Sequence, residues 1–181
     1  MSLRLTTTLG AMALALAAVL PAATSSQAAV AQGFVNGWDK QWDDFDDEGT
    51  LSRTSYSHSN AVAMWQLILV ADKAHRPDGS LFTAADVDCR FGPTTEYATK
   101  DWQRKFSLSA DGIVGPKTFH RAGSNLLGPV KEWNVERVEY WSGTTTQGTT
   151  FWRSLEDGHY SFQMPSGLKI DASYTRANAC S

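Results

Sequence analysis

The side chains that most often perform catalysis are few in this chain and widely separated. Its four histidines form no His-x-His or His-x-x-x-Asp pair, so the ligand set of a zinc peptidase is missing. A serine triad of the hydrolase type would need a Gly-x-Ser-x-Gly elbow, which the sequence lacks. A glycosidase needs two facing carboxylates, and the C-terminal region that could supply them is short, with candidates Glu132, Glu136 and Glu139. We predict no catalytic residue, and a hydrolase stays the less favoured alternative.

A second group of polar residues belongs to a short sequence motif that occurs twice, which we call the repeated phrase. Residues 88–95 (DCRFGPTT) and 111–118 (DGIVGPKT) both read Asp, two residues, an apolar residue, Gly, Pro, one residue, Thr. The polar side chains in and beside the phrase are the candidate ligand contacts: Asp88, Arg90, Gln103, Asp111 and Thr118. In the alternative interpretation each Asp accepts hydrogen bonds from its own backbone and fixes a turn. Gln66 and Gln103, which each follow a Trp, could equally be helix-surface residues.

The same phrase predicts where two helices begin. Pro93 and Pro116 each stand at an expected first helical position, where the missing N–H of proline costs nothing. The glycine before each proline is expected to adopt backbone angles that other residues resist. In both copies the phrase therefore predicts a loop that ends at the glycine and a helix that starts at the proline.

A further helix is predicted over residues 60–74, because apolar residues recur there at helical spacing. Ser59 or Asn60 can cap it by accepting a hydrogen bond from a free backbone N–H. We expect Trp65, Trp102 and Phe119 to point inward from the three helices, which makes a compact three-helix bundle.

Three stretches carry a resemblance to a known family: VAMWQLIL (62–69), DCRFGPTTEYATKDWQ (88–103) and ADGIVGPKTF (110–119). Together they resemble the peptidoglycan-binding domain 1 family over about residues 59–123. The resemblance implies a small helical module that binds bacterial cell wall, with peptidoglycan as its partner. One position departs from the family pattern, because Cys89 stands where the family usually has Gly after the first Asp.

The N-terminal segment, residues 1–31, has the pattern of a secretory signal peptide. Arg4 precedes a long apolar run, and small residues before Ala28 and Ala31 fit two alternative cleavage sites. We expect a secreted, extracellular protein associated with the cell wall, with no membrane contact after cleavage. The formal net charge of the chain is −3, and an acidic protein is a poor ligand for nucleic acid.

The chain has two cysteines, Cys89 and Cys180. In an oxidising compartment a pair of cysteines predicts a disulfide, which would tie the C-terminus to the middle of the chain. Free thiols and an intermolecular bridge remain open, because sequence does not show whether two sulfur atoms meet.

Two regions flank the predicted module, which we place at residues 59–128. Residues 32–58 are an acidic leader in which Trp38, Trp42 and Phe45 fall at helical spacing, so a short helix that packs on the module is expected. Residues 129–181 alternate apolar and polar side chains and contain the hairpin signal Asp157-Gly158. This pattern predicts a small antiparallel subdomain of three or four strands.

The tryptophans of this predicted sheet allow two interpretations. Trp133, Trp141 and Trp152 are expected to be core residues of a sheet that is short of aliphatic side chains, and stacking on a sugar ring is the alternative. The fold class is therefore α+β: a three-helix peptidoglycan-binding-like bundle followed by a small antiparallel β-sheet, docked and disulfide-linked.

The function expected from these patterns is non-catalytic binding of peptidoglycan by a secreted protein, with no cofactor and no metal. The alternative is a protein-interaction or inhibitor protein that is anchored to the wall and uses the β tail as its active surface.

Overall fold

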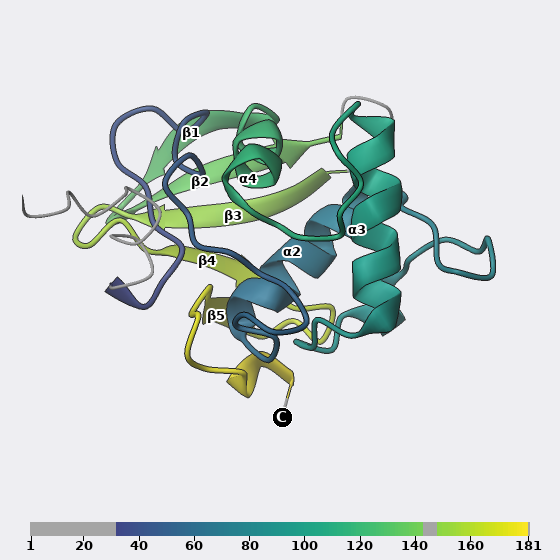
Figure 1. Cartoon of the computed structure of the whole chain (residues 1–181). Helices are drawn as coiled ribbons and strands as arrows, with labels where there is room; N and C mark the ends of the chain where they lie inside the picture. The colour runs from purple at the N-terminus through teal and green to yellow at the C-terminus, as the bar shows by residue number, and fades with distance from the viewer. Residues whose placement is uncertain (1–31, 143–147, 181) are drawn as a thin grey trace, which may run out of the picture.

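The computed structural model describes residues 32–142 and 148–180, so the predicted signal peptide lies outside the described residues. The fold is α+β, as predicted (Figure 1). The helical elements are α2 (Asn60–Ala71), the short η1 (Ala84–Asp86), α3 (Pro93–Lys105), α4 (Pro116–Gly123) and the short η2 (Asn178–Cys180). The strands are β1 (Leu126–Glu132), β2 (Val135–Trp141), β3 (Gly148–Ser154), β4 (Tyr160–Gln163) and β5 (Lys169–Asp171).

The helices begin where the sequence predicts. The Ser59 hydroxyl accepts a hydrogen bond from Val62 N at 3.3 Å and caps α2, while Pro93 and Pro116 open α3 and α4. The role expected of the preceding glycines is wrong. Gly92 (φ −85°) and Gly115 (φ −104°) are extended, a conformation open to any residue, and an added Cβ would meet no atom within 4 Å.

The predicted aromatic core is confirmed. Trp65 of α2 and Trp102 of α3 are fully buried and meet edge to face with ring centroids 5.1 Å apart. The ring centroid of Phe119 of α4 lies 6.2 Å from that of Trp65, again edge to face. Edge-to-face contacts of this kind add to the free energy gained from burial.

The helices share this core with the sheet. The buried carboxylate of Asp72, which follows α2, accepts hydrogen bonds from Trp102 Nε1 and from the Tyr140 hydroxyl of β2, both at 2.6 Å. All residues of α2 except Val70 are buried, which a surface helix with one apolar face would not be. The three helices are present, but a separate three-helix bundle is not seen, because α2 lies between α3 and the sheet (Figure 1).

The sheet has five antiparallel strands in the order β1-β2-β3-β4-β5, more than the three or four expected. The additional strand is β1, which starts before the predicted subdomain boundary at residue 129 and carries Gly128-Pro129 in its middle. Its register against β2 shifts between Leu127 and Val130. Proline is tolerated there because β1 is an edge strand, where a missing N–H breaks no ladder.

The expectation that the sheet tryptophans are core residues is wrong. Val138, Phe151 and Phe162 pair across β2, β3 and β4 and are fully buried on the helix-covered face. Trp133, at the β1–β2 turn, is 97% exposed, and Trp141 is 47% exposed. Trp152 lies on the opposite face, partly covered by Lys169, whose Nζ is 4.0 Å from the indole centroid. The core of the sheet is instead built from Phe and Tyr.

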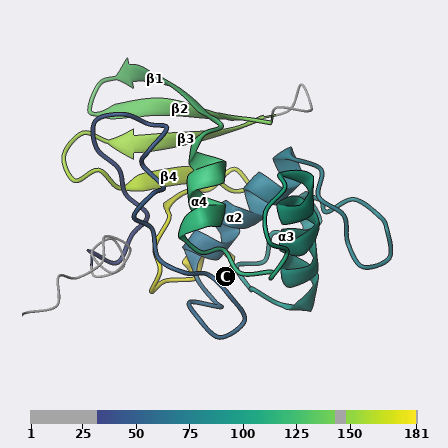
Figure 2. The same ribbon diagram turned by 45° about the horizontal axis from the view of Figure 1, so that its top comes forward.

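The acidic leader does not form the short helix expected of it. Residues 41–47 make consecutive turns, with Phe45 fully buried and Trp38 and Trp42 left 54% and 47% exposed. Residues 34–36 join the sheet instead: Val35 N donates to Ala172 O, and Val35 O accepts from Tyr160 N, both at 2.9 Å. The leader is therefore part of the folded unit and lies along the sheet (Figure 2).

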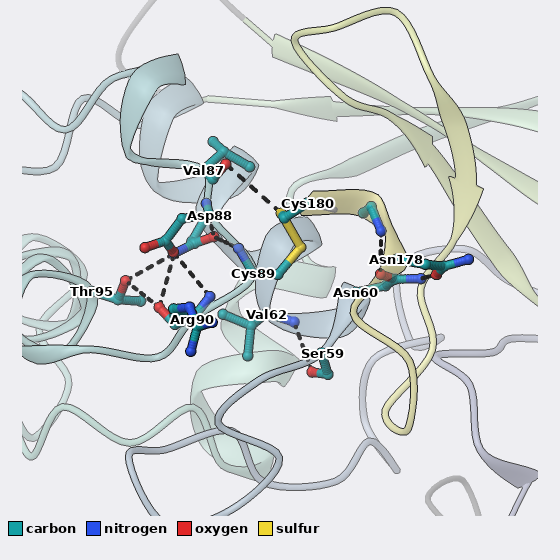
Figure 3. Close-up of a disulfide and its surroundings, with 12 residues drawn as sticks. Ser59, Asn60, Val62, Val87, Asp88, Cys89, Arg90, Thr95, Asn178 and Cys180 are labelled. Atoms are coloured by element: carbon teal, nitrogen blue, oxygen red, sulfur yellow. Dashed lines mark hydrogen bonds between the residues drawn. A yellow bond between two sulfur atoms is a disulfide. The ribbon is translucent and has the colours of Figure 1, made fainter.

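The predicted disulfide is confirmed. Cys89 and Cys180 are joined with their sulfur atoms 2.09 Å apart, which connects the loop before α3 to η2 (Figure 3). Asn60, the first residue of α2, reinforces this junction through hydrogen bonds with Asn178 Oδ1 and Ala179 N. The C-terminus is thus held against the start of α2.

Candidate functional site

The first copy of the repeated phrase is held by the side chain of Gln66. Its Oε1 accepts from the backbone N–H groups of Asp88 (3.0 Å) and Cys89 (3.1 Å). Its Nε2 donates to Asp88 Oδ1 (2.8 Å), Arg90 O (3.1 Å) and Thr95 Oγ1 (2.9 Å). A fully buried amide that satisfies both loop donors and loop acceptors fixes the loop on α2.

The second copy is held in the same way by Gln103 of α3. Its Oε1 accepts from Gly112 N at 2.8 Å, and its Nε2 donates to Asp111 Oδ1 (2.8 Å), Ile113 O (2.9 Å) and Thr118 Oγ1 (3.1 Å). Each helix thus holds the loop that leads into the next helix. We call Gln66 and Gln103 the clamp glutamines.

Four of the five candidate ligand residues, all except Arg90, form side-chain hydrogen bonds within the protein. Asp88 and Asp111 each accept from the backbone N–H two residues on, Arg90 N and Ile113 N, at 2.9 Å, which is the turn-forming role that the sequence left as the alternative. Gln103 and Thr118 are buried, and neither clamp glutamine is a helix-surface residue. Asp88, Arg90 and Asp111 keep exposed side chains, and Asp111 lines a cleft described below.

The leader passes both loops and ties them to one another. Leu51 and Val114 exchange backbone hydrogen bonds of 3.0 Å at the second loop. Farther along, Phe91 N donates to Ser57 O at 2.7 Å and Ser59 N donates to Cys89 O at 3.0 Å at the first loop. Residues 51–59, which we call the strap, therefore cover the inner edges of both copies.

The surface of this region has at least two clefts. The larger, of about 440 Å³, runs along α4 and is lined by Asp46, Leu108, Pro116, Lys117, His120 and Arg121. We call it the α4 cleft. Its floor is apolar, and its rim carries an exposed Lys117 together with His120, whose Nδ1 lies 2.6 Å from Asp46 Oδ1. Arg121 is held by stacking on the Phe106 ring at 4.1 Å.

The smaller cleft, of about 210 Å³, lies between the strap and the second loop. Its lining is Ser52, Arg53, Thr54, Glu96, Asp111, Gly112 and Ile113. Glu96 pairs with Lys100 at 2.5 Å and more loosely with Arg53 at 3.5 Å, and the hydrogen bond from Lys100 lowers the pKa of Glu96. Asp111 is the one predicted ligand residue that lines either cleft.

The comparison with family models falls on this same region. Residues 79–121 match the family model described as "Putative peptidoglycan binding domain". The match covers both copies of the phrase, α3 and most of α4, and confirms the resemblance seen in the sequence. No curated protein and no solved structure matches the chain.

The match also contains five of the six residues that line the α4 cleft, all except Asp46. Sequence reasoning missed Leu108, Lys117 and Arg121 as site residues, because no spacing rule connects the end of α3 with one face of α4. Their only sequence signal was their position inside the resembling segment.

Within residues 32–142 and 148–180, no cluster of His, Cys, Asp and Glu has the geometry to hold a metal ion. The helices in these ranges are all too short or too polar to cross a membrane.

Proposed function

We propose that this chain is a secreted, non-catalytic protein that binds bacterial peptidoglycan through the α4 cleft. The observation that carries the proposal is the coincidence of the family match with the larger cleft of the helical region. The volume of the α4 cleft, about 440 Å³, lies within the usual range of small-ligand pockets, roughly 300–1,000 Å³.

The chemistry of the α4 cleft supports a peptide-like ligand with a free carboxylate. Leu108 and Pro116 offer an apolar floor, while Lys117 and Arg121 supply positive charge at the rim. Arg121 also donates to Asn125 Oδ1 at 2.9 Å, so its guanidinium is held in place before any ligand arrives. Charged groups that are fixed in advance lose less entropy on binding.

The proposal is tested by sedimentation of the protein with purified peptidoglycan sacculi. Lys117→Glu reverses a charge at the cleft rim, and we expect it to weaken binding about tenfold or more. Lys131→Glu makes the same charge change on the exposed strand β1, away from the cleft lining, and is expected to bind like the wild type. Equal binding by all three proteins, or no sedimentation of the wild type, would contradict the proposal.

Zymography on cell-wall substrate tests the non-catalytic part separately. We expect no lytic band, since the described residues bring no nucleophile, base and oxyanion donor together in either cleft. A clear band from the purified protein would show a hydrolase.

The exposed sheet tryptophans favour a second candidate function, docking of a protein partner on the β tail. Trp133 is nearly fully exposed and has φ +54°, a left-handed conformation that is unfavourable for a bulky residue. Strain and exposure at one residue point to a contact outside the chain. A pull-down that recovers a partner protein with the wild type and with Lys117→Glu, but not with Trp133→Ala, would favour this function over the first.

A further inference from the structure

A third cleft, of about 240 Å³, opens where the leader passes the end of the sheet. Its lining comes from three segments that are distant in sequence: Gly37, Trp38 and Asp39 of the leader, Glu136 of β2, and Arg153, Ser154 and Leu155 at the end of β3. It shares no lining residue with the α4 cleft and lies outside the segment that matches the family model. Figure 2 shows the purple leader passing the same end of the sheet as the β3–β4 turn.

Arg153 is the buried centre of this cleft, and each of its three guanidinium nitrogens already donates within the protein. Nη1 donates to both oxygens of Asp44 at 2.9 and 2.7 Å, Nε donates to Glu136 Oε2 at 3.1 Å, and Nη2 donates to Glu136 Oε2 and to Asp39 O. A guanidinium whose three nitrogens all donate within the protein has little capacity left for a ligand. Arg153 therefore positions the acceptors of the cleft rather than offering donors.

The carboxylates of the cleft keep acceptor capacity for a ligand. Both bonds from Arg153 end on Oε2 of Glu136, which leaves Oε1 outside that ion pair. The Asp39 side chain is exposed at the rim, and Ser154 Oγ already accepts from Glu156 N and Asp157 N. A ligand that satisfies such a cleft must itself donate hydrogen bonds.

The net charge of the cleft indicates which kind of hydrogen-bond donor it binds. Asp39, Asp44 and Glu136 face a single cation, Arg153, so the cleft has an excess of negative charge at and above neutral pH. Burial raises the pKa of Asp44 to about 6, against the hydrogen bonds from Tyr160 and Arg153 that lower it, so this carboxylate is ionised at pH 7.5. The nearest leader cation, Lys40, lies with its Nζ over Trp42 at 5.2 Å and does not line the cleft. The field attracts a cation more than a neutral hydroxyl group.

Trp38 gives the cleft an aromatic wall with a fixed position. An added Cβ on Gly158 (φ +72°) would lie 2.8 Å from Trp38 Cε2, so the indole rests directly on the glycine backbone. With its other side open to solvent, the indole can receive a cation on its face. Leu155 adds an apolar surface for an aliphatic stem.

We propose that this cleft binds a primary ammonium group on an aliphatic stem, as a lysine side chain carries, with Asp39 and Glu136 as acceptors and Trp38 as the aromatic wall. The ammonium can belong to a peptide of the cell wall or to a lysine of a partner protein. The proposal does not depend on the α4 cleft, and each can fail without the other.

The test is an NMR titration of ¹⁵N-labelled protein at pH 7.5 and low salt with Nα-acetyl-lysine amide. The same compound acetylated at Nε serves as the matched probe without charge. We expect saturable shifts at residues 37–39 and 153–155 with a Kd of a few millimolar, roughly 1–10 mM, for the amine and not for the acetylated form. Raising the salt concentration should weaken the binding, because the cleft is partly exposed.

Three variants test the named groups. Asp39→Asn and Glu136→Gln remove one charge each, and we expect each to weaken binding about fivefold. Asn tolerates the left-handed φ of +58° at position 39, and the Gln amide oxygen can still accept from Arg153, so both variants should fold. Trp38→Ala should weaken binding by a similar factor, about fivefold. Trp42→Ala, a leader tryptophan of comparable exposure outside the cleft lining, should bind like the wild type.

Three results would overturn the proposal: equal affinity for the amine and its acetylated form, equal loss in Trp42→Ala and Trp38→Ala, or no saturable shift in this cleft up to about 100 mM. Sacculi with chemically acetylated amines then distinguish the two sources. If acetylation weakens sedimentation of the wild type but not of Glu136→Gln, the ammonium belongs to the wall; if lysine amide binds and acetylation changes nothing, it belongs to a protein partner.

Discussion

In the first copy of the repeated phrase Gln66 of α2 holds the loop, and in the second copy Gln103 of α3 holds it with a similar set of bonds. The sets differ in that Gln66 Oε1 accepts from two backbone N–H groups and Gln103 Oε1 from one. The residue after the Asp differs. Gly112 sits at φ +76° in the second copy, whereas Cys89 takes nearly the same conformation, φ +60°, in the first. A residue with a side chain is less stable than glycine in this left-handed conformation. Cys89 takes this conformation and is the residue that forms the disulfide.

Comparison of the two copies shows which residues of the phrase are needed for the loop and which are specific to one copy. The glutamine, the Asp and the Thr make the same contacts twice, so they belong to the fold. The disulfide and the α4 cleft occur once each, on different copies. We infer that the first copy anchors the C-terminus and leaves the second copy, with α4, to meet a ligand.

Loss of a clamp glutamine should have the largest effect. Gln66→Leu leaves the N–H groups of Asp88 and Cys89 without their acceptor in a buried site, and we expect the free energy of unfolding to fall by about 3–4 kcal/mol. Gln103→Leu removes one such acceptor, at Gly112, and should cost about 2–3 kcal/mol. Urea denaturation measures both values.

Gln163→Leu is the control for this pair, because Gln163 is exposed on β4 and its amide donates to Gly167 O at the surface. It should change stability by less than about 0.5 kcal/mol. If the three substitutions had equal effects, the two loops would not be held by their glutamines.

Removal of the disulfide should come next. Cys180→Ser opens a connection between residues 91 positions apart, and we expect a loss of about 2–4 kcal/mol, measured by urea denaturation without reductant. Because the second copy has no such link, amide hydrogen exchange should accelerate at residues 88–91 and 178–180 more than at 111–114. Uniform acceleration across both copies would show that the disulfide does not anchor the first copy specifically.

The strap that passes both loops follows a titratable anchor, Glu48, which accepts hydrogen bonds from Tyr174 OH and Asn36 N. Burial raises the pKa of Glu48 from 4.5 to about 8, although these hydrogen bonds lower it. The folded state then holds a proton that the unfolded state has lost, so stability should fall as pH rises from about 4.5 to 8 and level off above.

Glu48→Gln removes this titration. Between pH 5 and pH 9 the wild type should lose more stability than the variant, by at least about 2 kcal/mol, as measured by urea denaturation at both values. Asp44, whose pKa is about 6, titrates in both proteins and cancels in the comparison. Parallel pH profiles would exclude Glu48 as the anchor.

The glycines of the second copy give the smallest expected effects. Gly112→Ala places a Cβ 2.8 Å from Glu96 Cγ and Lys100 Cε in a left-handed conformation, and we expect a loss of about 1–2 kcal/mol in the free energy of unfolding. Gly115→Ala meets no atom and should stay within about 0.5 kcal/mol of the wild type in the same urea measurement. If Gly115→Ala cost more stability than Gly112→Ala, the glycine before the proline would determine the loop conformation instead.

The sequence predicted the parts of the fold that follow from local rules. Proline at a helix start, the Ser59 cap and the inward Trp65 and Trp102 all depend on residues within one helix or loop. The β1 strand was missed because Gly128-Pro129 breaks the alternating pattern, and only its edge position makes the proline acceptable. The spacing of the leader aromatics fitted a helix, but contacts with the sheet hold this segment extended and in turns.

The candidate sites were harder to predict, because their residues meet only in the folded protein. Asp111 was found from its place in the phrase, yet its main role is to form the turn. Lys117 and Arg121 have no partner in sequence that marks them as a site, and the third cleft joins Trp38 with Arg153 across most of the chain. The expectation that Trp133 lies in the core was wrong, because composition does not show which tryptophans a sheet buries.

The most direct test of the account is a map of where peptidoglycan touches the protein. Solubilised muropeptides should be titrated into ¹⁵N-labelled protein and the amide shifts followed. Our account predicts that the perturbed amides gather at residues 108–121, on the α4 cleft, and that Lys117→Glu needs about tenfold more ligand to reach the same shifts. Perturbations confined to β1–β3, or none at any residue, would contradict the assignment of wall binding to this segment.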